Sequence, residues 1–275
     1  MTDERGTVDD SSIKHEDAGI DTSDDAHSVG SNDSAKDNAD EEKSTPWYIE
    51  LPIIIVIALL LSVAVQTFIG RVYLIPSESM QPTLHGCEGC TGDRIWVDKV
   101  AYRFSEPEAG DVLVFNGPDS WNTGYVSQRS TNPIRNSFET LGSWTGLTAP
   151  DENALVKRVI ATGGQTVQCR EGDPGVMVDG KKVDDSFIMT PPQFPIDSTT
   201  GSEQCGGGYF GPVKVPEGHL WMMGDNRTNS ADSRFHIGDE LQGTVPVENV
   251  VGKVQSIILP FNRIGGVDDP DIQSK

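Results

Sequence analysis

One serine of this sequence lies where its hydroxyl could act as a nucleophile. Ser79 belongs to the stretch from Pro76 to Leu84, which holds a second serine, Ser77, and a second proline, Pro82. Proline fixes the backbone φ angle, so we expect a stiff segment. Stiffness suits a nucleophile, because geometry contributes much of the rate. A serine hydroxyl is a weak nucleophile until a base takes its proton, and taken alone the segment is more typical of a linker.

The candidate base is Lys157, in an alternating run over residues 156–160. A lysine on a strand is usually a solvated, outward-facing residue. To accept a proton near pH 7 its pKa must fall from about 10.4 to about 8, which is roughly 3 kcal/mol of destabilisation of the ammonium form. Burial among Val156, Val159 and Ile160 would produce such a shift.

A third group of polar residues fills residues 224–234. Most of the side chains in this stretch form hydrogen bonds or carry charge: Asp225, Asn226, Arg227, Thr228, Asn229, Ser230, Asp232, Ser233 and Arg234. Polar residues this dense often form a turn network that fixes a site, and they are as typical of a plain surface loop.

The clearest element near these groups is a membrane helix. No charged residue occurs from Leu51 to Gly70. At about 1.5 Å a residue, this run spans roughly 30 Å, the thickness of a bilayer's hydrocarbon core. Trp47 and Tyr48 precede it, where amphipathic rings suit the membrane interface. A buried core helix is the alternative, but this run is apolar on all sides. We therefore predict one permanent transmembrane helix over residues 47–70, in contact with the lipid bilayer.

The charge of the chain, −21 in total, is concentrated at its start. Residues 1–46 hold 14 Asp and Glu against 4 Lys and Arg. Such a stretch buries too little apolar surface to fold, so we expect a disordered acidic tail. A cleaved secretory signal would begin with a short basic stretch instead. Because nucleic-acid binding needs a basic patch, nucleic acid is excluded as a partner. Lys36 and Lys43 slightly favour a cytoplasmic tail and an extracytoplasmic main domain.

The main domain, residues 71–265, consists of short apolar runs broken by Gly, Pro and Asp. No long 3.6-residue period occurs there, so the expected class is mainly β. The predicted strands lie at 94–99, 111–115, 156–160, 166–169, 176–178, 181–183, 219–223 and 250–259. Two stretches, 116–153 and 184–213, are expected as insertions or long loops. Residues 266–275 are expected to be a frayed polar tail.

The four cysteines all follow the membrane helix. Cys87, Cys90, Cys169 and Cys205 could in principle bind zinc, but a second CxxC pair is missing. Disulfides persist in oxidising compartments, which agrees with an extracytoplasmic domain. We favour the pairs Cys87–Cys90 and Cys169–Cys205, and predict no metal and no cofactor.

Several of these motifs, in their order along the chain, resemble the bacterial type I signal peptidases. The matching segments run from about residue 47 to 260 and include 79–84, 92–99, 110–115, 157–159, 163–164 and 224–234, with Thr228 where an Asp is usual. The resemblance implies a β-rich catalytic domain with a small cap or insertion region. It also implies roles: Ser79 as nucleophile, Lys157 as general base, and Ser77 with the Ser79 N–H as the oxyanion donors.

In the third segment, the resemblance implies that Ser230 orients Lys157 by a hydrogen bond. Asp232 and Arg234 would form an ion pair that braces the loop, and Asp225 and Arg227 would be structural. Glu78 has no implied role.

The function implied is a plasma-membrane serine endopeptidase that removes signal peptides from exported preproteins by a Ser/Lys dyad, after small-x-small sites. One alternative is a membrane-anchored binding or assembly module that kept the fold and lost activity. Another is a specialised Ser/Lys peptidase for pilin-type precursors. His85, His219 and His236 could suggest a Ser–His enzyme, but the intact lysine segment argues against it.

Overall fold

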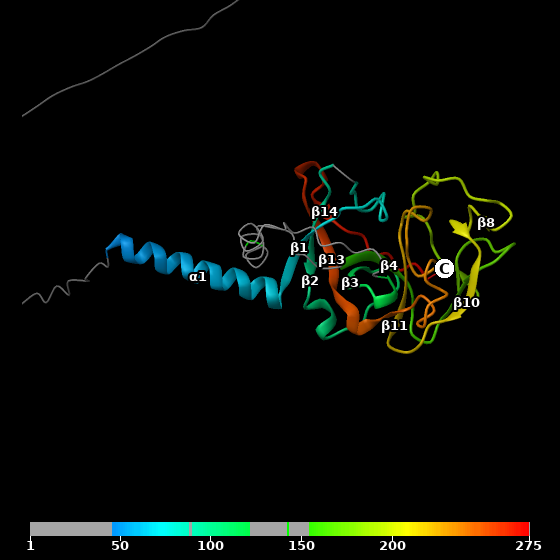
Figure 1. The fold of residues 1–275 in the computed structure, drawn as a ribbon, viewed down its shortest axis with the longest axis horizontal. Coiled ribbons are helices and arrows are strands. Elements are labelled where there is room, and N and C mark those ends of the chain that lie inside the picture. Colours follow the sequence, from blue (N-terminus) through cyan, green and yellow to red (C-terminus); the bar gives the residue numbers. More distant parts are fainter. Residues whose placement is uncertain (1–45, 88–89, 122–141, 143–153, 275) are drawn as a thin grey trace, which may run out of the picture. The chain divides into compact units, whose positions relative to one another are not determined.

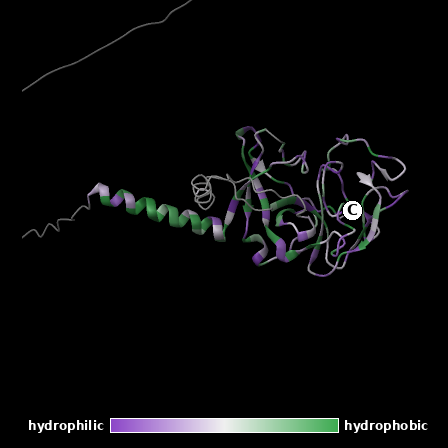
Figure 2. Ribbon diagram, in the orientation of Figure 1, coloured by the Kyte–Doolittle hydropathy of each residue, from purple (hydrophilic) through white to green (hydrophobic). Residues whose placement is uncertain are grey.

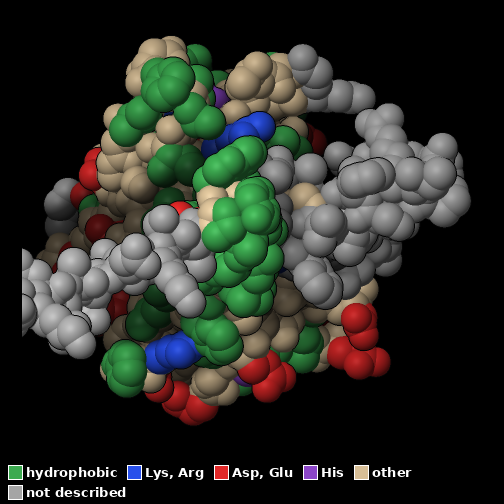
Figure 3. Space-filling model, turned by 90° about the vertical axis from the view of Figure 1, so that its left-hand side faces the viewer, with side chains coloured by type: hydrophobic (Ala, Val, Ile, Leu, Met, Phe, Trp, Pro, Cys, Tyr) green, Lys and Arg blue, Asp and Glu red, His purple; other side chains and the backbone are tan. Residues whose placement is uncertain are grey.

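The computed structural model describes residues 46–87, 90–121, 142 and 154–274, and the structural statements below concern these residues. The first element is an apolar helix, α1, Trp47–Phe68. It is the one described helix long and apolar enough to cross a membrane, and none of its residues is buried. Most of the α1 ribbon is coloured as hydrophobic, with polar residues near its two ends (Figure 2), and hydrophobic side chains dominate the centre of the face in Figure 3.

The rest of the described chain is built from short antiparallel strands (Figure 1). The main sheet contains β1 Gly70–Leu74, β2 Arg94–Asp98, β3 Val112–Asn116, β4 Ala154–Thr162, β11 His219–Met223, β12 Val245–Pro246, β13 Val250–Leu259 and β14 Gly265–Gly266. Their order is β1-β2-β13-β3-β4-β11-β12, with β14 also paired to β13. Register shifts interrupt the pairing of β13 with β2 and β3, and of β11 with β4. Such bulges bend strands and increase their twist, which lets the sheet curl.

Two smaller sheets complete the fold. One joins β10 Phe210–Lys214, β5 Thr166–Cys169, β6 Met177–Val178 and β7 Lys181–Lys182. The other pairs β8 Gly201–Ser202 with β9 Gly207–Gly208. Short 3-10 helices lie at Ala101–Arg103, Asp119–Trp121, Val247–Asn249 and Phe261–Arg263. The tight β6–β7 turn has positive φ at both Asp179 and Gly180, as expected for an Asp-Gly hairpin.

Strand β4 lies between the main hydrophobic clusters. On one side, its Ile160 packs with Trp221, Phe210 and the buried residues of the β5–β10 sheet. Another cluster joins Ile95 and Val97 of β2 to β3, β13 and the segment after β1. A central strand with buried neighbours is a rigid support for a functional side chain.

The structure departs from the sequence-based expectations at three places. The helix expected to reach residue 70 ends at Phe68, because β1 begins at Gly70. A Cβ on Gly70 would lie 2.5 Å from the Trp96 ring, so the strand pairs this closely only with glycine there. The expected loop 184–213 contains β8, β9 and the start of β10.

The prediction for the C-terminal segment was also wrong. Residues 266–275 were predicted to be a frayed tail, yet Ile272 is completely buried in the core beside β4. The Gln273 side chain donates to the Ile160 carbonyl at 2.9 Å. One apolar side chain that finds a core position is enough to dock a segment whose composition is otherwise polar. The predicted acidic tail and most of the predicted insertion 116–153 lie outside the described residues.

Candidate active site

The turn that carries Ser79 is held by the side chains that follow it. Met80 and Leu84 are buried in the cluster beneath β1 and β2, so Ser79, one residue earlier, stays at the surface of that core. The end of the segment is fixed by Asp93, which is buried and accepts the His85 N–H at 2.7 Å. Arg263 pairs with the same carboxylate at 2.9 Å. The stiffness expected from the prolines thus has further supports in packing and hydrogen bonds.

Strand β4 brings Lys157 to the serine from 78 positions away in the sequence. Lys157 Nζ lies 2.7 Å from Ser79 Oγ. The lysine side chain is 5% exposed, and this burial lowers its pKa to about 8 against the opposing effect of the Asp232 and Asp225 carboxylates. Removing an ammonium group from water disfavours its charged form. At such a pKa a useful fraction of the amine is neutral near pH 7 and can accept the hydroxyl proton.

The next residue on β4 has a different partner. Consecutive strand residues face opposite sides, and Arg158 forms a buried ion pair with Asp225, 2.8 Å between Nη2 and Oδ2. The Thr83 hydroxyl donates to the same carboxylate, and Arg158 Nη1 donates to the carbonyls of Gly110 and Asp268. Asp225 was expected to be structural, whereas the function of Arg158 was not foreseen. The pair fastens the polar loop to the strand that carries Lys157.

Gly224 starts the polar loop at a point of very close contact. A Cβ at this position would lie 2.5 Å from the Ser79 carbonyl oxygen and 2.3 Å from Ser230 Oγ. The Gly224 N–H donates to Asp232, and the Arg234 guanidinium pairs with Asp232 at 2.8 Å. Burial raises the pKa of the Asp232 carboxyl, but Arg234 and the Gly224 N–H outweigh it and hold the pKa below its usual range. The expected bracing ion pair is therefore present in the structure.

Two supporting residues behave differently from each other. Ser77 Oγ lies 3.3 Å from Ser79 Oγ, so the Ser77 hydroxyl is directly beside the candidate nucleophile. The bond expected from Ser230 to Lys157 is not formed: Ser230 Oγ is buried and has no hydrogen-bond partner among the described residues. The Ser230 side chain packs against Gly224, where an added Cβ would lie 2.3 Å from its Oγ. Arg227 donates to the Gly224 carbonyl at 3.2 Å, and burial lowers its pKa to about 10.

The site combines the Ser79 hydroxyl, the buried Lys157 amine and several hydrogen-bond donors around them. These are the groups that a serine hydrolase with a lysine base requires. A family model described as signal peptidase, peptidase S26, matches residues 48–259. The chain belongs to this family. As a member of it, the protein is a serine endopeptidase.

Curated relatives agree with the family model over most of their length. The probable signal peptidase I of Mycobacterium leprae is 49% identical over 245 residues, 85% of this chain and 83% of the relative. The signal peptidase I of Mycobacterium tuberculosis H37Rv is 48% identical, covering 91% of this chain and 85% of the relative. Signal peptidase I T of Bacillus subtilis is 31% identical over 81% of this chain and 91% of its own. The resemblance seen in the motifs thus extends over most of the chain.

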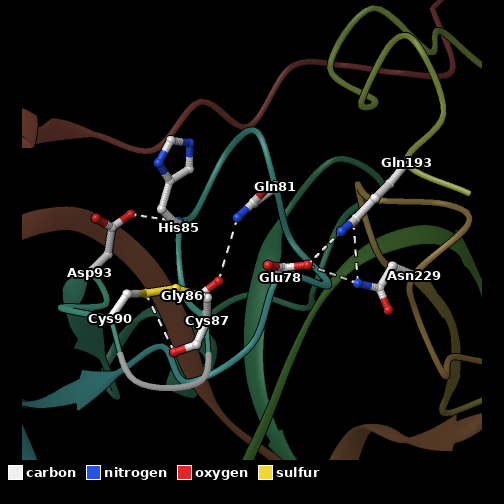
Figure 4. Close-up of a disulfide and its surroundings, with 9 residues drawn as sticks. All are labelled: Glu78, Gln81, His85, Gly86, Cys87, Cys90, Asp93, Gln193 and Asn229. Carbon is white, nitrogen blue, oxygen red and sulfur yellow. Dashed lines mark hydrogen bonds between the residues drawn. A yellow bond between two sulfur atoms is a disulfide. The ribbon is translucent and has the colours of Figure 1, made fainter.

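Both cysteine pairs favoured from the sequence are disulfides in the structure. Cys169 and Cys205 are completely buried and connect the end of β5 to the loop before β9. Cys87 and Cys90 are bonded close to the nucleophile segment (Figure 4).

Sequence reasoning missed the residues that hold the backbone around Ser79. The Asn226 N–H donates to the Ser79 carbonyl at 3.1 Å, and its side-chain amide donates to the Glu78 carbonyl at 3.1 Å. Asn226 belongs to a loop already singled out, so only its partner was missing. Gln193, which contacts Glu78, lies in a Pro-rich stretch that carries no such signal.

Proposed function

We propose that this peptidase cleaves its substrates by a dyad in which Ser79 is the nucleophile and Lys157 the general base. The observation that carries this proposal is the 2.7 Å separation of Lys157 Nζ and Ser79 Oγ, with the lysine buried and its pKa lowered to about 8. A nucleophile within hydrogen-bond reach of a neutral base meets the geometric and protonation requirements together.

The reaction follows from these positions. Neutral Lys157 takes the Ser79 proton while Oγ bonds to the scissile carbonyl carbon, and the carbonyl oxygen becomes an oxyanion. The Ser79 N–H, which has no acceptor among the described residues, and the Ser77 hydroxyl donate to that oxygen. The Lys157 ammonium then protonates the leaving amine as the C–N bond breaks. Neutral Lys157 then takes a proton from a water whose oxygen bonds to the acyl carbon. As the bond between that carbon and Ser79 Oγ breaks, the Lys157 ammonium returns the proton to Oγ and the carboxylic acid product is released.

The substrates proposed are exported preproteins, cut after small-x-small sites at the end of their signal peptides. Support comes from the family and from relatives named signal peptidase I. We further propose that α1 crosses the plasma membrane once, with the N-terminus cytoplasmic and the peptidase domain outside. A single residue, Ile69, separates α1 from β1, so the domain begins where the helix ends. Two disulfides suit an oxidising, extracytoplasmic compartment.

The test is cleavage of a preprotein by the full-length protein in detergent or lipid. Ser79→Ala and Lys157→Ala should each abolish cleavage, and Lys157→Arg should be equally inactive because arginine does not lose its proton. Ser198→Ala and Lys214→Ala change the same residue types at exposed positions and should keep the parent rate. Cleavage by either dyad variant would refute the dyad. An inactive parent would favour the alternative of a binding module.

A further inference from the structure

We propose that Glu78 is a positioning residue, and that Gln193 and Asn229 hold it so that the Ser79 N–H points at the oxyanion. This proposal rests on the Ser79/Lys157 mechanism above. Its starting point is a convergence of three chain segments (Figure 4). Glu78 Oε2 accepts a hydrogen bond from Gln193 Nε2 at 2.6 Å and from Asn229 Nδ2 at 3.1 Å. Both donors are neutral amides, so hydrogen bonds and not an ion pair hold the carboxylate. The two donors come from two other segments of the chain.

The backbone of Glu78 is fixed as firmly as its side chain. Its carbonyl oxygen accepts from Asn226 Nδ2 at 3.1 Å and from the Gln81 N–H at 3.0 Å. This carbonyl and the Ser79 N–H belong to one planar trans peptide unit, so they point in opposite directions and turn together. Bonds that fix the Glu78 carbonyl therefore also fix the direction of the Ser79 N–H. The Ser79 carbonyl on the other side is fixed by the Asn226 N–H at 3.1 Å.

Gln193 joins the side-chain and backbone parts of this network. While its Nε2 donates to Glu78, its Oε1 accepts from Asn226 Nδ2 at 2.5 Å and from Asn229 Nδ2 at 3.2 Å. One glutamine thus orients the amide that holds the Glu78 carbonyl and also binds the Glu78 carboxylate. Asn226 Oδ1 is buried and has no partner among the described residues, so the hold on the Glu78 carbonyl comes from the Nδ2 side of this amide. Hydrogen bonds connected in this way stiffen the site they surround.

The segment that carries Gln193 is itself docked on the polar loop. The Phe194 N–H donates to Thr228 Oγ1 at 3.1 Å, and the Met189 N–H donates to the Asp225 carbonyl at 3.0 Å. Thr228, the one departure from the family pattern in that loop, therefore has a hydrogen-bond partner in the segment 184–213, here called the excursion. The Pro-rich stretch, predicted only as a long loop, supports the nucleophile turn from outside the main sheet.

Loss of this network would affect the reaction in a specific way. The peptide unit between Glu78 and Ser79 could then rotate, and the Ser79 N–H would turn away from the oxyanion. The contact of Ser79 Oγ with Lys157 would stay, and so would the surfaces that bind substrate. We therefore expect kcat to fall while KM stays nearly constant, because the lost hydrogen bond forms only in the transition state.

A charge exchange between Glu78 and Gln193 tests the idea in the full-length protein. Gln193→Glu places two carboxylates in contact, and kcat for preprotein cleavage should fall about 10- to 100-fold with KM within about twofold. The double variant Glu78→Gln/Gln193→Glu restores one amide donor facing one carboxylate, and its kcat should recover most of the loss. The matched control is Gln204→Glu, the same change at an exposed position of the same excursion, which should behave as the parent.

A second set of variants covers the case in which Gln193→Glu does not fold. Glu78→Ala and Gln193→Ala remove the two partners without adding charge. If they act through one network, the double variant should lose no more than the worse single variant. Three results would overturn the positioning role. The first is a Gln193→Glu variant as active as Gln204→Glu, and the second is a folded Glu78→Gln/Gln193→Glu variant that recovers no activity. The third is a pair of alanine losses that are fully additive. In contrast, cleavage by Ser79→Ala would overturn the mechanism on which it rests.

Discussion

The surroundings of Lys157 determine the pKa of its amine, and through it both the rate of the reaction and the stability of the fold. Burial lowers its pKa to about 8, so at pH 7 about one molecule in ten holds the neutral amine. We expect kcat/KM to rise about tenfold for each pH unit below about 8 and to level off above it. The check is a pH profile from 6 to 10 with the full-length enzyme. A flat profile over this range would show that Lys157 is not the titrating base.

The same shift links pH to the stability of the fold. The folded state disfavours the Lys157 ammonium, so below about pH 8, where the folded lysine is charged, the loss of unfolding free energy is greatest. From there the stability rises with pH up to the unfolded pKa of about 10.4. Lys157→Met removes this titration and keeps the volume, so its unfolding free energy should lack that rise and should not fall below the parent's at pH 7. Urea unfolding at pH 7, 9 and 10.5 measures both. This variant is expected to be stable and inactive.

Gly224 shows how little room the site leaves. Gly224→Ala would force apart the Ser79 carbonyl and the Ser230 side chain, which lie 2.5 Å and 2.3 Å from the added carbon. A nucleophile displaced by a few tenths of an ångström to 1 Å should lose roughly 100-fold in kcat. Gly238→Ala is the control, since a Cβ there meets nothing within 4 Å. Equal rates for the two variants would contradict the close packing at Gly224.

Among the elements, the longer alternating runs and the β6–β7 hairpin around Asp179-Gly180 were predictable, and the other two-residue strands were not. The strands expected at 94–99, 166–169 and 219–223 correspond to β2, β5 and β11. The mainly β class and the family are both confirmed. The two-residue strands β8, β9, β12 and β14 carry too few side chains for a period to show. β1 was missed because it directly follows the apolar helix, where no turn residue other than Gly70 marks the change.

The Cys169–Cys205 disulfide connects two of these small elements across 36 positions. Closing a loop of this length restricts the unfolded chain and contributes about 4 kcal/mol. Cys169→Ala/Cys205→Ala should therefore lower the melting temperature clearly. Cys87→Ala/Cys90→Ala opens a loop of separation 3 and should lower it much less. Calorimetry of both double variants is the measurement, and the reverse order would show that loop closure does not govern their stability.

At the scale of the whole molecule, both ends of the peptidase domain belong to its fold. A fragment of residues 70–275 keeps β1 and Ile272, and we expect it to fold without α1. A fragment of residues 70–265, close to the predicted boundary, loses Ile272 from the core and the Asp268 carbonyl from buried Arg158. It should be less stable by at least about 2–5 kcal/mol. Urea unfolding compares the two, and Ile272→Ala in the longer fragment should reproduce most of the difference. Equal stability would mean that the C-terminal segment does not contribute to the core.

The site could be predicted in part because its chemistry lies in short motifs. Ser79, Lys157 and the 224–234 loop were identified as candidates before any contact between them was known. Their roles stay predictions until the variants are assayed. The supporting contacts of Arg158, Asn226 and Gln193 could not be predicted, because each depends on which segment folds against which. A glutamine in a Pro-rich stretch differs in no visible way from a solvated one until its partner at Glu78 is known.

Strand β4 places Lys157 and Arg158 side by side on opposite faces, one directed to Ser79 and one to Asp225. A slip of one residue in its alignment with β3 would exchange the two faces. The guanidinium, which stays protonated, would then face the serine, and the amine would face the carboxylate. A molecule misaligned in this way would be catalytically silent, however compact it was. Turnover per mole of protein therefore counts the correctly aligned molecules in a refolded preparation, a quality measure that circular dichroism cannot supply.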